Sequence, residues 1–524
     1  MRILGISALT HNTSAALVED GKLVAAAEEE RFTYQKYNKG FEGGNRAPVN
    51  AINWILDKFK LKLKDIDYIA HPDVSVYENL GFDVVKFRFQ NFIESISKEA
   101  KNNIFIYHHL SHGSSSFRAS GFKKSNILTI DGVGEGVSTC LFVGKNNEIE
   151  LIRTYPEIQS IGFLYTRISE LLGLGPFGWG EGKTMALASF GKVDPTFIKM
   201  MTVTKHDYKI NNEVLKEFEK YRRVSGEFSK KQINLATTLQ YLVEKAAIEL
   251  VDFLHEATGY KKICIAGGVG LNSKMNGAIF ELPFIKDIFI QPAANDAGLS
   301  VGAALEAYAK LGVKSKFRMN HAYLGPEYSD KETEETLRLC KLKYEYYDDI
   351  EGIAAELIAK GKIIGWFQGR MEFGPRALGN RSILADPTDE NMKNRVNHFV
   401  KHREHWRPFA PSVLKEKQSK YFESNYVNPF MTIVFNIKQG KEKEIPAVSH
   451  VDGTARIQTV EKKTNPKFYK LIKKFEKEKG VPLVLNTSFN DKNQPIVRTP
   501  SDAIKTFYST GMDYLIINNF LLKK

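Results

Sequence analysis

Three histidines within five residues are the first side chains in this sequence whose spacing suits a chemical role. They lie in the stretch YHHLSHGSSS, residues 107–116, directly after the apolar run Ile104–Ile106. If the chain becomes helical after that run, His108 and His112 fall on one face, about one turn apart. Two imidazoles at this spacing can share one metal ion. His109 lies three residues before His112, so that pairing stays open, as does ordinary hydrogen bonding at a polar helix end.

Two aspartates at the ends of apolar strands could complete a ligand set with these histidines. Ile127–Ile130 runs into Asp131, the first residue of DGVGEG, and a short strand at Ile288–Gln291 is followed by Asp296. Imidazole and carboxylate donors together suit a borderline divalent metal ion, and two of each make four ligands. For Asp296, capping of a helix expected at 297–309 is an alternative of equal weight.

Two glycine-rich stretches are candidate contacts for a nucleotide. GLGPFGWGEGKTMALASFG, residues 173–191, has six glycines and predicts a loop shaped around a ligand, with Lys183 as a charged contact. GGVGLN, residues 267–272, follows a predicted strand at Lys262–Ala266 and precedes a helix. In that order of elements, backbone N–H groups are offered to an adenosine or a phosphate.

A dense group of cations follows a predicted strand at Ile363–Phe367. GRMEFGPRALGNRS, residues 369–382, has three arginines and three glycines, which favours an anion cradle over a helix because guanidinium groups match phosphate bidentately. Further cations stand in KHREHWRPFAP, residues 401–411, and NTSFN follows a strand at Pro482–Leu485. The sequence therefore predicts a second site, for a small phosphorylated or carboxylated molecule.

The elements expected to position the first site are two β-turn-β units. Asp20-Gly21 makes a hairpin turn in the first unit, and His11 lies in its first polar turn. The strands are expected at 2–7, 15–19 and 22–28 in the first unit, and at 127–130, 137–143 and 149–152 in the second. This duplication resembles the nucleotide-binding core of the actin and sugar-kinase superfamily, in which each unit contributes one phosphate-facing turn.

Other segments indicate how the chain is organised. Apolar residues at helical spacing predict amphipathic helices at 232–256 and within 462–479, the second with a solvated basic face. Glu28–Arg31 is an acidic cluster at a strand end, for which a solvated edge is the plain interpretation. Between 310 and 350 the chain becomes rich in lysine and tyrosine, and we place a domain boundary there, at residue 340.

Composition limits the class of protein. The 524 residues, 43% hydrophobic and 26% charged, suit a globular chain with large cores. Its three cysteines are widely separated, which indicates a reducing compartment and no thiolate zinc site. No segment resembles a signal peptide or a membrane span, so we expect a cytoplasmic protein without a membrane partner. The net charge of +13 is spread along the chain, and a nucleic acid is not the partner we expect.

Together these motifs resemble the O-carbamoyltransferase family that includes the nodulation-factor, cephalosporin, novobiocin and tobramycin carbamoyltransferases. The matching blocks cover nearly the whole chain in order: HHLSH, DGVGEG, GEGKTMALASFG, GGVGLN, NDAG, GRMEFGPRALGNRSILADP, VKHREHWRPFAPSVL, VLNTSFN and QPIVRTP. The resemblance implies an α/β enzyme. Residues 1–340 are expected to form an actin-like ATPase (ASKHA) domain similar to tRNA threonylcarbamoyl-transferase proteins, and residues 341–524 a YrdC-like domain.

The resemblance also implies a reaction. Carbamoyl phosphate and ATP, with Mg²⁺, are expected to form carbamoyl-adenylate in the second domain. The carbamoyl group then passes to a hydroxyl of a sugar or natural-product acceptor at a metal site in the first domain. A homodimer is compatible with this expectation, and the oligomeric state stays open.

Roles carry over to individual positions through the same resemblance. His108, His112, Asp131 and Asp296 look like the metal ligands, with Fe²⁺ favoured by analogy. Adenosine or cofactor contacts are expected at Lys183, Gly267, Gly268 and Asn272. The carbamoyl-phosphate and adenylate cradle is expected at Arg376, Arg381, Lys401, Arg403, Arg407, Asn486, Ser488 and Arg498. Of these, Arg376 and Lys401 are the expected catalytic cations, and His11 matches a histidine proposed to activate the acceptor as general base.

Two positions depart from the family pattern. Asn12 stands where Asp commonly follows the histidine, and Tyr34 stands in EEERFTYQK where Arg is usual. Both lie near the expected acceptor entrance, so they leave the acceptor open. A tRNA-modifying threonylcarbamoyl enzyme is an alternative motivated by the same folds and the basic charge, although the KHREHWRPFAP block is of the carbamoyl-phosphate type. A non-catalytic nucleotide-binding regulator is a third.

Overall fold

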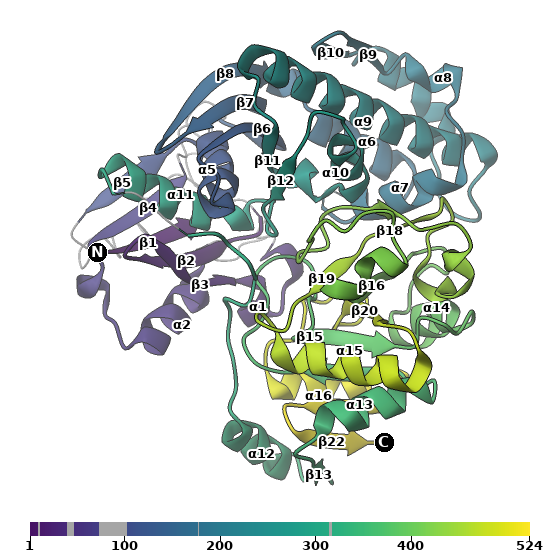
Figure 1. The fold of residues 1–524 in the computed structure, drawn as a ribbon. Coiled ribbons are helices and arrows are strands. Elements are labelled where there is room, and N and C mark those ends of the chain that lie inside the picture. Colours follow the sequence, from purple (N-terminus) through teal and green to yellow (C-terminus); the bar gives the residue numbers. More distant parts are fainter. Residues whose placement is uncertain (9–10, 39–46, 73–101, 177, 314–316) are drawn as a thin grey trace. The chain divides into compact units, whose positions relative to one another are not determined.

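The computed structural model describes residues 1–8, 11–38, 47–72, 102–176, 178–313 and 317–524. The chain divides into two compact units (Figure 1). The first comprises Met1–Thr33 and Tyr37–Met319, and the second comprises Asn320–Lys524 together with the short segment Tyr34–Lys36.

The division after Met319 precedes the boundary that we expected at residue 340. The chain joins the second unit earlier because its backbone already pairs there. Phe373 donates its N–H to the carbonyl of Ala322 at 2.7 Å, and Gly325 donates to the carbonyl of Met371 at 2.9 Å. Backbone pairing of this kind leaves no mark on local composition.

The first unit begins with a five-stranded sheet in the order β3-β2-β1-β4-β5. Its strands are β1 (Arg2–Ser7), β2 (Ser14–Glu19), β3 (Lys22–Glu28), β4 (Tyr68–Pro72) and β5 (Asn103–Ile106). β1 pairs antiparallel with β2 and parallel with β4. The β2–β3 hairpin turns at Asp20 and Gly21, whose φ angles of 48° and 74° are those of a type I′ turn, so the predicted turn is confirmed.

A second five-stranded sheet has the order β12-β11-β6-β7-β8. Its strands are β6 (Lys124–Gly134), β7 (Val137–Lys145), β8 (Glu148–Pro156), β11 (Lys262–Ala266) and β12 (Asp287–Ile290). β6 pairs antiparallel with β7 and parallel with β11, just as β1 pairs with β2 and β4. The expected duplication is therefore confirmed at the level of topology, and the fold is mixed α/β.

Two helices pack between these sheets and connect them. α11 (Ala297–Lys310) contacts β1, β2 and α5 (His108–Ser120), while α5 also contacts β6 and β11 (Figure 1). The helix predicted at 232–256 is confirmed as α9 (Lys230–Thr258). The other α-helices among the described residues of this unit are α1 (Glu30–Thr33), α2 (Val49–Phe59), α6 (Ile161–Leu171), α7 (Glu181–Leu187), α8 (Pro195–Ile198) and α10 (Ser273–Phe280).

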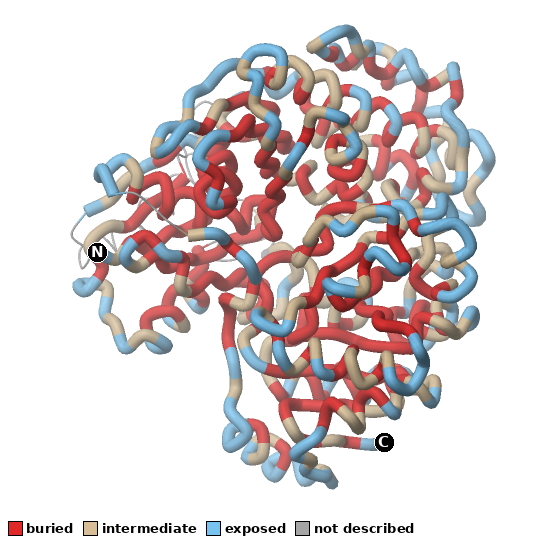
Figure 2. The backbone as a smooth tube through the Cα atoms, viewed as in Figure 1, coloured by how far each residue is buried: buried red, intermediate tan, exposed pale blue. Residues whose placement is uncertain are grey.

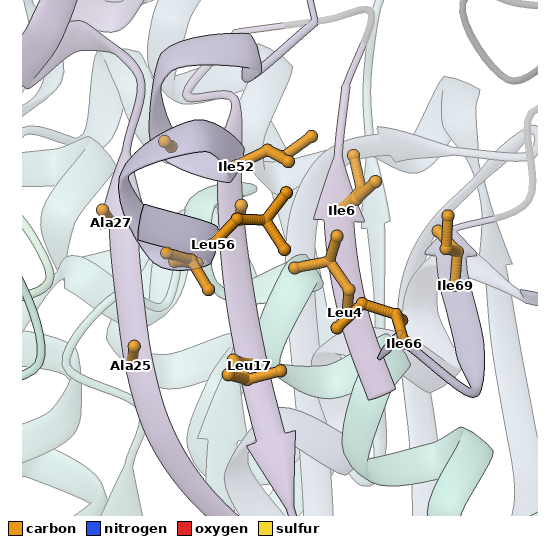
Figure 3. Packing of buried hydrophobic residues seen from close by; sticks show 12 residues of the cluster. Leu4, Ile6, Leu17, Ala25, Ala27, Ile52, Leu56, Ile66 and Ile69 are labelled. Carbon is orange, nitrogen blue, oxygen red and sulfur yellow. The ribbon is translucent and has the colours of Figure 1, made fainter. Parts of the chain in front are cut away.

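The core of the first sheet is apolar and closed to water. α2 covers one face, and its Ile52 and Leu56 pack with Leu4, Ile6 and Leu17 of the strands (Figure 3). Figure 2 shows β1 to β4 and α11 buried along most of their length. Polar side chains in such surroundings are costly unless they find partners, which makes the polar groups on α5 and α11 notable.

The second unit is built on one mixed sheet in the order β13-β22-β21-β14-β15-β20-β16-β19. Its strands are β13 (Glu345–Tyr346), β14 (Ile364–Phe367), β15 (Arg381–Ala385), β16 (Ala410–Leu414), β19 (Gln458–Val460), β20 (Leu483–Ser488), β21 (Tyr514–Ile517) and β22 (Phe520–Lys523). Two further strands, β17 (Phe435–Asn436) and β18 (Thr454–Ala455), pair with each other outside this sheet. The helices are α12 (Asp330–Leu339), α13 (Ile350–Ala359), α14 (Met392–Arg395), α15 (Pro466–Lys479) and α16 (Pro500–Tyr508). α15 confirms the predicted basic amphipathic helix.

Two glycine-rich predictions were wrong in detail. Within 173–191, where we expected a loop, α7 occupies Glu181–Leu187 because its buried Thr184 and Leu187 side chains offset the cost of its glycine. Within DGVGEG, where we expected one turn, Asp131–Gly134 continues β6. Only Glu135 and Gly136, with φ of 57° and 77°, form the turn.

The acidic cluster Glu28–Arg31 is buried, which corrects the expected solvated edge. Arg31 lies 2.7 Å from Glu28 Oε2 and 2.9 Å from Glu30 Oε1. The Glu29 carboxylate accepts the N–H of Ala51 at 2.9 Å, at the first turn of α2. Charge neutralisation and helix capping thus replace the hydration that we expected.

Among the described residues, no helix combines the length and the apolar composition that crossing a membrane requires. The three cysteines, Cys140, Cys264 and Cys340, are free.

Candidate functional site

Four side chains from three elements of the first unit form one buried cluster, which we call the metal cluster: His108, His112, Asp131 and Asp296. His108 Nε2 and His112 Nε2 lie 3.1 and 3.3 Å from Asp131 Oδ2. The same nitrogens lie 3.8 and 3.6 Å from Asp296 Oδ1. One atom from each residue falls within 4.8 Å of every other, so the structure brings the four predicted ligands together.

The donor set of this cluster fits a divalent metal ion. An ion bound at ~2.1 Å by nitrogen and oxygen holds neighbouring donors roughly 3.0–3.4 Å apart at right or tetrahedral angles. The nitrogen–oxygen separations around Asp131 lie in that range, and those to Asp296 are slightly longer. Two imidazoles with two carboxylates suit ions of the zinc and iron class.

Protonation within the metal cluster favours charged carboxylates. Burial raises the pKa of Asp131, but hydrogen bonds with His108 and His112 outweigh it and leave that pKa well below its ordinary value. Burial lowers the pKa of His112, and hydrogen bonds to Asp131 and Asp296 raise it to about 9. Two buried anions beside two imidazoles are therefore electrostatically prepared for a cation.

A local irregularity in β6 places Asp131. The β6–β7 ladder pairs Ile130 with Thr139 and resumes at Gly134 with Val137, so the three residues between are released from regular pairing. Gly268 then donates its N–H to Asp131 Oδ1 at 2.9 Å, while Oδ2 faces the histidines. This bulge is why Asp131 reaches the cluster from within a strand.

α5 presents His108 and His112 as its spacing predicted. A Cβ at Gly134 would lie 2.3 Å from His108 Cδ2, so the ring packs where only glycine leaves room. His109 points elsewhere: its Nδ1 lies 2.8 Å from Thr129 Oγ1 and its Nε2 3.0 Å from the carbonyl of Val137. Burial lowers the pKa of His109 to about 3. Both ring nitrogens of His109 are engaged, so the geometry favours His108 as the ligand.

Asp296 occupies the N-cap position of α11, which was the alternative interpretation. Its side chain makes no capping hydrogen bond, and its backbone is already helical (φ −57°, ψ −19°). The carboxylate instead faces the two histidines. The position of Asp296 in the chain is that of a helix cap, but its side chain is oriented as a metal ligand. The side chain therefore belongs to the metal cluster.

His11 stands at the rim of the metal cluster. Its Nδ1 lies 2.7 Å from Asn12 Oδ1 and 3.8 Å from Asp296 Oδ2, and its side chain is 26% exposed. With Nδ1–H donated to Asn12, Nε2 is the basic nitrogen of the ring. Asn12 adopts a left-handed backbone (φ 57°), held by its N–H bond to the carbonyl of Tyr37.

Three predicted nucleotide contacts of the first unit serve the fold in this structure. Asn272 caps α10, accepting the N–H of Met275 at 3.1 Å, and its amide pairs reciprocally with that of Gln240. Gly267 has φ of 88°, and a Cβ there would lie 2.2 Å from the carbonyl of Ile130. Lys183 in α7 donates to the carbonyl of Leu174 at 2.8 Å. Their roles toward a nucleotide stay predictions.

In the second unit, Lys401 is a buried cation surrounded by oxygen acceptors. Its ammonium donates to the carbonyls of Ser488 and Asn490 at 2.9 and 2.7 Å, and to Asn490 Oδ1 at 2.6 Å. Burial lowers the pKa of Lys401 well below its ordinary value, and the charges of Arg403 and Lys36 lower it further. Lys401 and Ser488 thus contact each other, and their role in binding a donor stays a prediction.

Arginines gather near Lys401 and repel one another. Burial lowers the pKa of Arg456 well below its ordinary value, and the nearby charges of Arg376, Arg403 and Arg407 lower it further. Arg456 Nε is buried and has no hydrogen-bond partner in the part of the chain that the structure describes. We call Arg376, Lys401, Arg403, Arg407 and Arg456 the cation cluster. Like charges at close range favour a bound anion.

Arg456 is a residue that sequence reasoning missed. It lies in TARIQTV just before β19, with one glycine, Gly453, close by and no other arginine. Only the parallel pairing of β19 with β16 brings it to the others. Asn490 was likewise passed over, although it belongs to the NTSFN stretch that the sequence had singled out.

Arg381, Arg498 and Asn486 have other partners. The Arg381 guanidinium is fully buried, donates to four main-chain carbonyls and stacks 3.5 Å from the centre of the Phe367 ring. Arg498 Nη1 donates to the hydroxyl of Tyr328 at 3.1 Å. Asn486 Nδ2 donates to Ser412 Oγ at 2.9 Å. For these three, direct binding of a substrate stays a prediction.

Known proteins resemble this chain over most of its length. It is 38% identical to nodulation protein NolNO of Sinorhizobium fredii, over 98% of this chain and 79% of that protein. Nodulation protein NolO of Bradyrhizobium diazoefficiens is 39% identical over 80% of this chain and 78% of its own length. A protein of Amycolatopsis lactamdurans named 3'-hydroxymethylcephem-O-carbamoyltransferase is 29% identical over 64% of each chain.

Among solved structures, HypF of T. kodakarensis aligns with 60% of this chain and 48% of its own, at 13% identity and a TM-score of 0.41. Component A of (R)-2-hydroxyglutaryl-CoA dehydratase from Acidaminococcus fermentans aligns with 60% of this chain and 99% of its own, at 16% identity and a TM-score of 0.36. At these values the likeness carries no inference.

Family models agree with the relatives. The model described as Carbamoyltransferase N-terminus matches residues 2–101 and 75–305, and the one described as Carbamoyltransferase C-terminus matches residues 355–524. A transferase of this kind moves a carbamoyl group from a donor to an acceptor. With both models matched in order along one chain, and a relative 38% identical over nearly all of it, the chain belongs to the carbamoyltransferase family.

Proposed function

We propose that the protein is an O-carbamoyltransferase that uses carbamoyl phosphate and ATP and delivers the carbamoyl group to a hydroxyl of a sugar or natural-product acceptor. The observation that carries this proposal is the metal cluster with His11 beside it, in a chain of the carbamoyltransferase family. The name of the Amycolatopsis relative, 3'-hydroxymethylcephem-O-carbamoyltransferase, supports an oxygen acceptor. We also propose that the reaction takes place in the cytoplasm.

The two units divide the work in this proposal. The first, with its two sheets of one topology, is the actin-like domain that binds the acceptor. The second, with its mixed eight-stranded sheet, is the YrdC-like domain that activates the donor. The cation cluster supports the second assignment, because a donor and a nucleotide that both carry phosphate need several positive partners.

Activation proceeds in two steps. Water releases phosphate from carbamoyl phosphate and leaves carbamate, whose oxygen attacks the α-phosphorus of ATP. The bond between the α- and β-phosphates breaks, which forms carbamoyl-adenylate and releases pyrophosphate. Lys401, Arg376 and Arg407 neutralise charge on these phosphates, and fixed cations cost little reorganisation at the moment of reaction. Mg²⁺ enters with ATP as part of the co-substrate.

Transfer takes place at the metal cluster. The acceptor oxygen attacks the carbamoyl carbon, and AMP leaves as the carbon–oxygen bond to its phosphate breaks. His11 Nε2 accepts the hydroxyl proton, while its Nδ1–H bond to Asn12 fixes the tautomer. A divalent ion held by His108, His112, Asp131 and Asp296 would supply Lewis-acid stabilisation of developing negative charge, and Fe²⁺ is the ion favoured by analogy with the family.

Pyrophosphate chemistry tests the proposal without knowledge of the acceptor. We expect exchange of labelled pyrophosphate into ATP that depends on carbamoyl phosphate. Lys401→Met should abolish this exchange, whereas Lys473→Met, which alters a half-exposed lysine paired with Glu476, should preserve it. His11→Asn should retain exchange and lose carbamoylation of any acceptor found in a panel of sugars. No donor-dependent exchange in the wild-type protein, supplied with Mg²⁺ and Fe²⁺, would refute the proposal.

A further inference from the structure

A second group of metal-ligating side chains lies in the first unit and shares no residue with the metal cluster. His206 stands in the turn between β9 (Met201–Thr204) and β10 (Asp207–Ile210), and Asp252 and Glu256 stand on α9. One donor atom from each lies within 4.8 Å of the others. We propose that these three residues bind a divalent ion of the zinc class, which fastens the β9–β10 hairpin to α9.

The spacing on α9 brings the carboxylates to one face. Asp252 and Glu256 are four residues apart, and Glu249 precedes Glu256 by seven, so all three project toward the hairpin turn. Asp252 and Glu256 face the His206 ring. Glu249 instead accepts the backbone N–H of His206 at 2.9 Å.

The backbone of His206 is fixed on both sides. Glu249 holds its N–H, and Arg153 Nη1 donates to its carbonyl at 2.8 Å. The ring lies against Phe253, with centroids 5.8 Å apart. A histidine held in this way presents Nε2 to the two carboxylates before the ion arrives. Ion binding then costs less conformational entropy than it would at a mobile side chain.

The distances fit a shared ion better than a hydrogen bond. His206 Nε2 lies 3.4 Å from Asp252 Oδ2 and 3.3 Å from Glu256 Oε1. Charge-assisted hydrogen bonds are shorter, about 2.7–2.9 Å. Donors bound at ~2.1 Å around a tetrahedral ion lie ~3.4 Å apart. Within the described residues, Nε2 is closed to water and makes no hydrogen bond, so a buried donor points between two carboxylates.

The charges around the group leave room for a cation. Asp252 and Glu256 bring two negative charges, and the one ammonium close to them is that of Lys205, 3.2 Å from Glu256 Oε1 among the residues described here. The side chains of Asp252 and Glu256 are 36% and 52% exposed, which lets water fill the remaining coordination positions.

Counting bound Zn²⁺ tests the proposal. The full-length protein is stripped with a chelator and titrated with Zn²⁺ in a calorimeter. We expect His206→Gln and Asp252→Asn each to bind one equivalent fewer than the wild-type protein, while the metal cluster still binds. Glu219→Gln, which alters an exposed carboxylate paired with Arg222, is the matched control and should keep the full count.

A substitution of opposite sign sharpens the test. Lys205→Met removes the ammonium that competes for Glu256, and we expect it to tighten Zn²⁺ binding by up to ~5-fold, the scale of a surface ion pair. Zn²⁺ should also raise the melting temperature of the wild-type protein more than that of Asp252→Asn. An unchanged count in both His206→Gln and Asp252→Asn, or weaker binding in Lys205→Met, would overturn the proposal.

Discussion

Replacing Gly268 by alanine would show whether this glycine exists to hold Asp131. A Cβ at position 268 would lie 2.8 Å from Asp131 Oδ1, closer than carbon and oxygen can approach. The same oxygen accepts the Gly268 N–H at 2.9 Å. The backbone at 268 is not in the left-handed region, so alanine is conformationally allowed there. The carboxylate, rather than the helix or strand, must therefore move.

The size of the effect follows from how far it must move. An ordinary carbon–oxygen contact of ~3.4 Å requires a shift of roughly 0.6 Å, beyond the ~0.2 Å tolerance of a metal–ligand distance. Asp131 Oδ2 would leave its position 3.1 and 3.3 Å from His108 and His112. Disturbing a group that orients a ligand typically costs 10- to 100-fold in metal affinity, or about 1.4–2.7 kcal/mol.

Competition with a chromogenic chelator measures this affinity. The comparison is made in an Asp252→Asn background, so that the proposed hairpin site does not contribute. Gly182→Ala is the control, because a Cβ at 182 meets nothing within 4 Å. If Gly268→Ala binds the metal within twofold of its parent, Asp131 is not held by Gly268 in the way that we argue.

Three further outcomes follow. Burial lowers the pKa of His71 to about 4, so between pH 6.5 and 4 the unfolded chain binds a proton at this residue that the folded chain does not. The contribution of His71 to the free energy of unfolding should therefore fall by about 2 kcal/mol from pH 7 to pH 5, and parallel urea-unfolding profiles for wild type and His71→Gln would contradict this. Arg381→Met leaves four main-chain carbonyls without the guanidinium that donates to them. We expect the free energy of unfolding to fall by about 3–5 kcal/mol, and a fall below 1 kcal/mol would be inconsistent with a structural role for Arg381. Asp296→Asn keeps the shape of the side chain but removes a ligand charge, so metal affinity should fall at least ~10-fold. Stability should change by less than ~0.5 kcal/mol, because this side chain makes no capping hydrogen bond and Asn is as good an N-cap as Asp. Unchanged metal affinity in this variant would contradict the ligand role of Asp296.

Local patterns predicted much of the first unit. The Asp20-Gly21 hairpin, the strand at Lys262–Ala266 and the helix that carries His108 and His112 depend on turn chemistry and periodicity within a few residues. Such signals are present in the sequence itself. The two sheets of like topology could be predicted because the same β-turn-β pattern appears twice in the chain.

The predictions that were wrong or missing concern residues whose surroundings depend on contacts between segments distant in the sequence. Glu28–Arg31 looked solvated because its partners in α2, such as Ala51, lie about twenty residues away. Arg456 carried no motif and joins the cation cluster only through pairing of β19 with β16. Arg381 stood in the most arginine-rich stretch, yet main-chain carbonyls surround it. Residue type predicted a charge in each case, but not whether that charge meets protein or ligand.

Asp296 and Asn272 show this limit most closely, because each directly precedes a helix and each is a good N-cap by type. Asn272 does cap α10, accepting the N–H of Met275. Asp296 leaves the first turn of α11 without its side-chain cap, although a cap is typically worth about 1 kcal/mol. A carboxylate forgoes that gain only where another interaction is stronger, and here it faces His108 and His112. An unfilled cap beside two imidazoles is therefore itself an argument that Asp296 is placed for a cation.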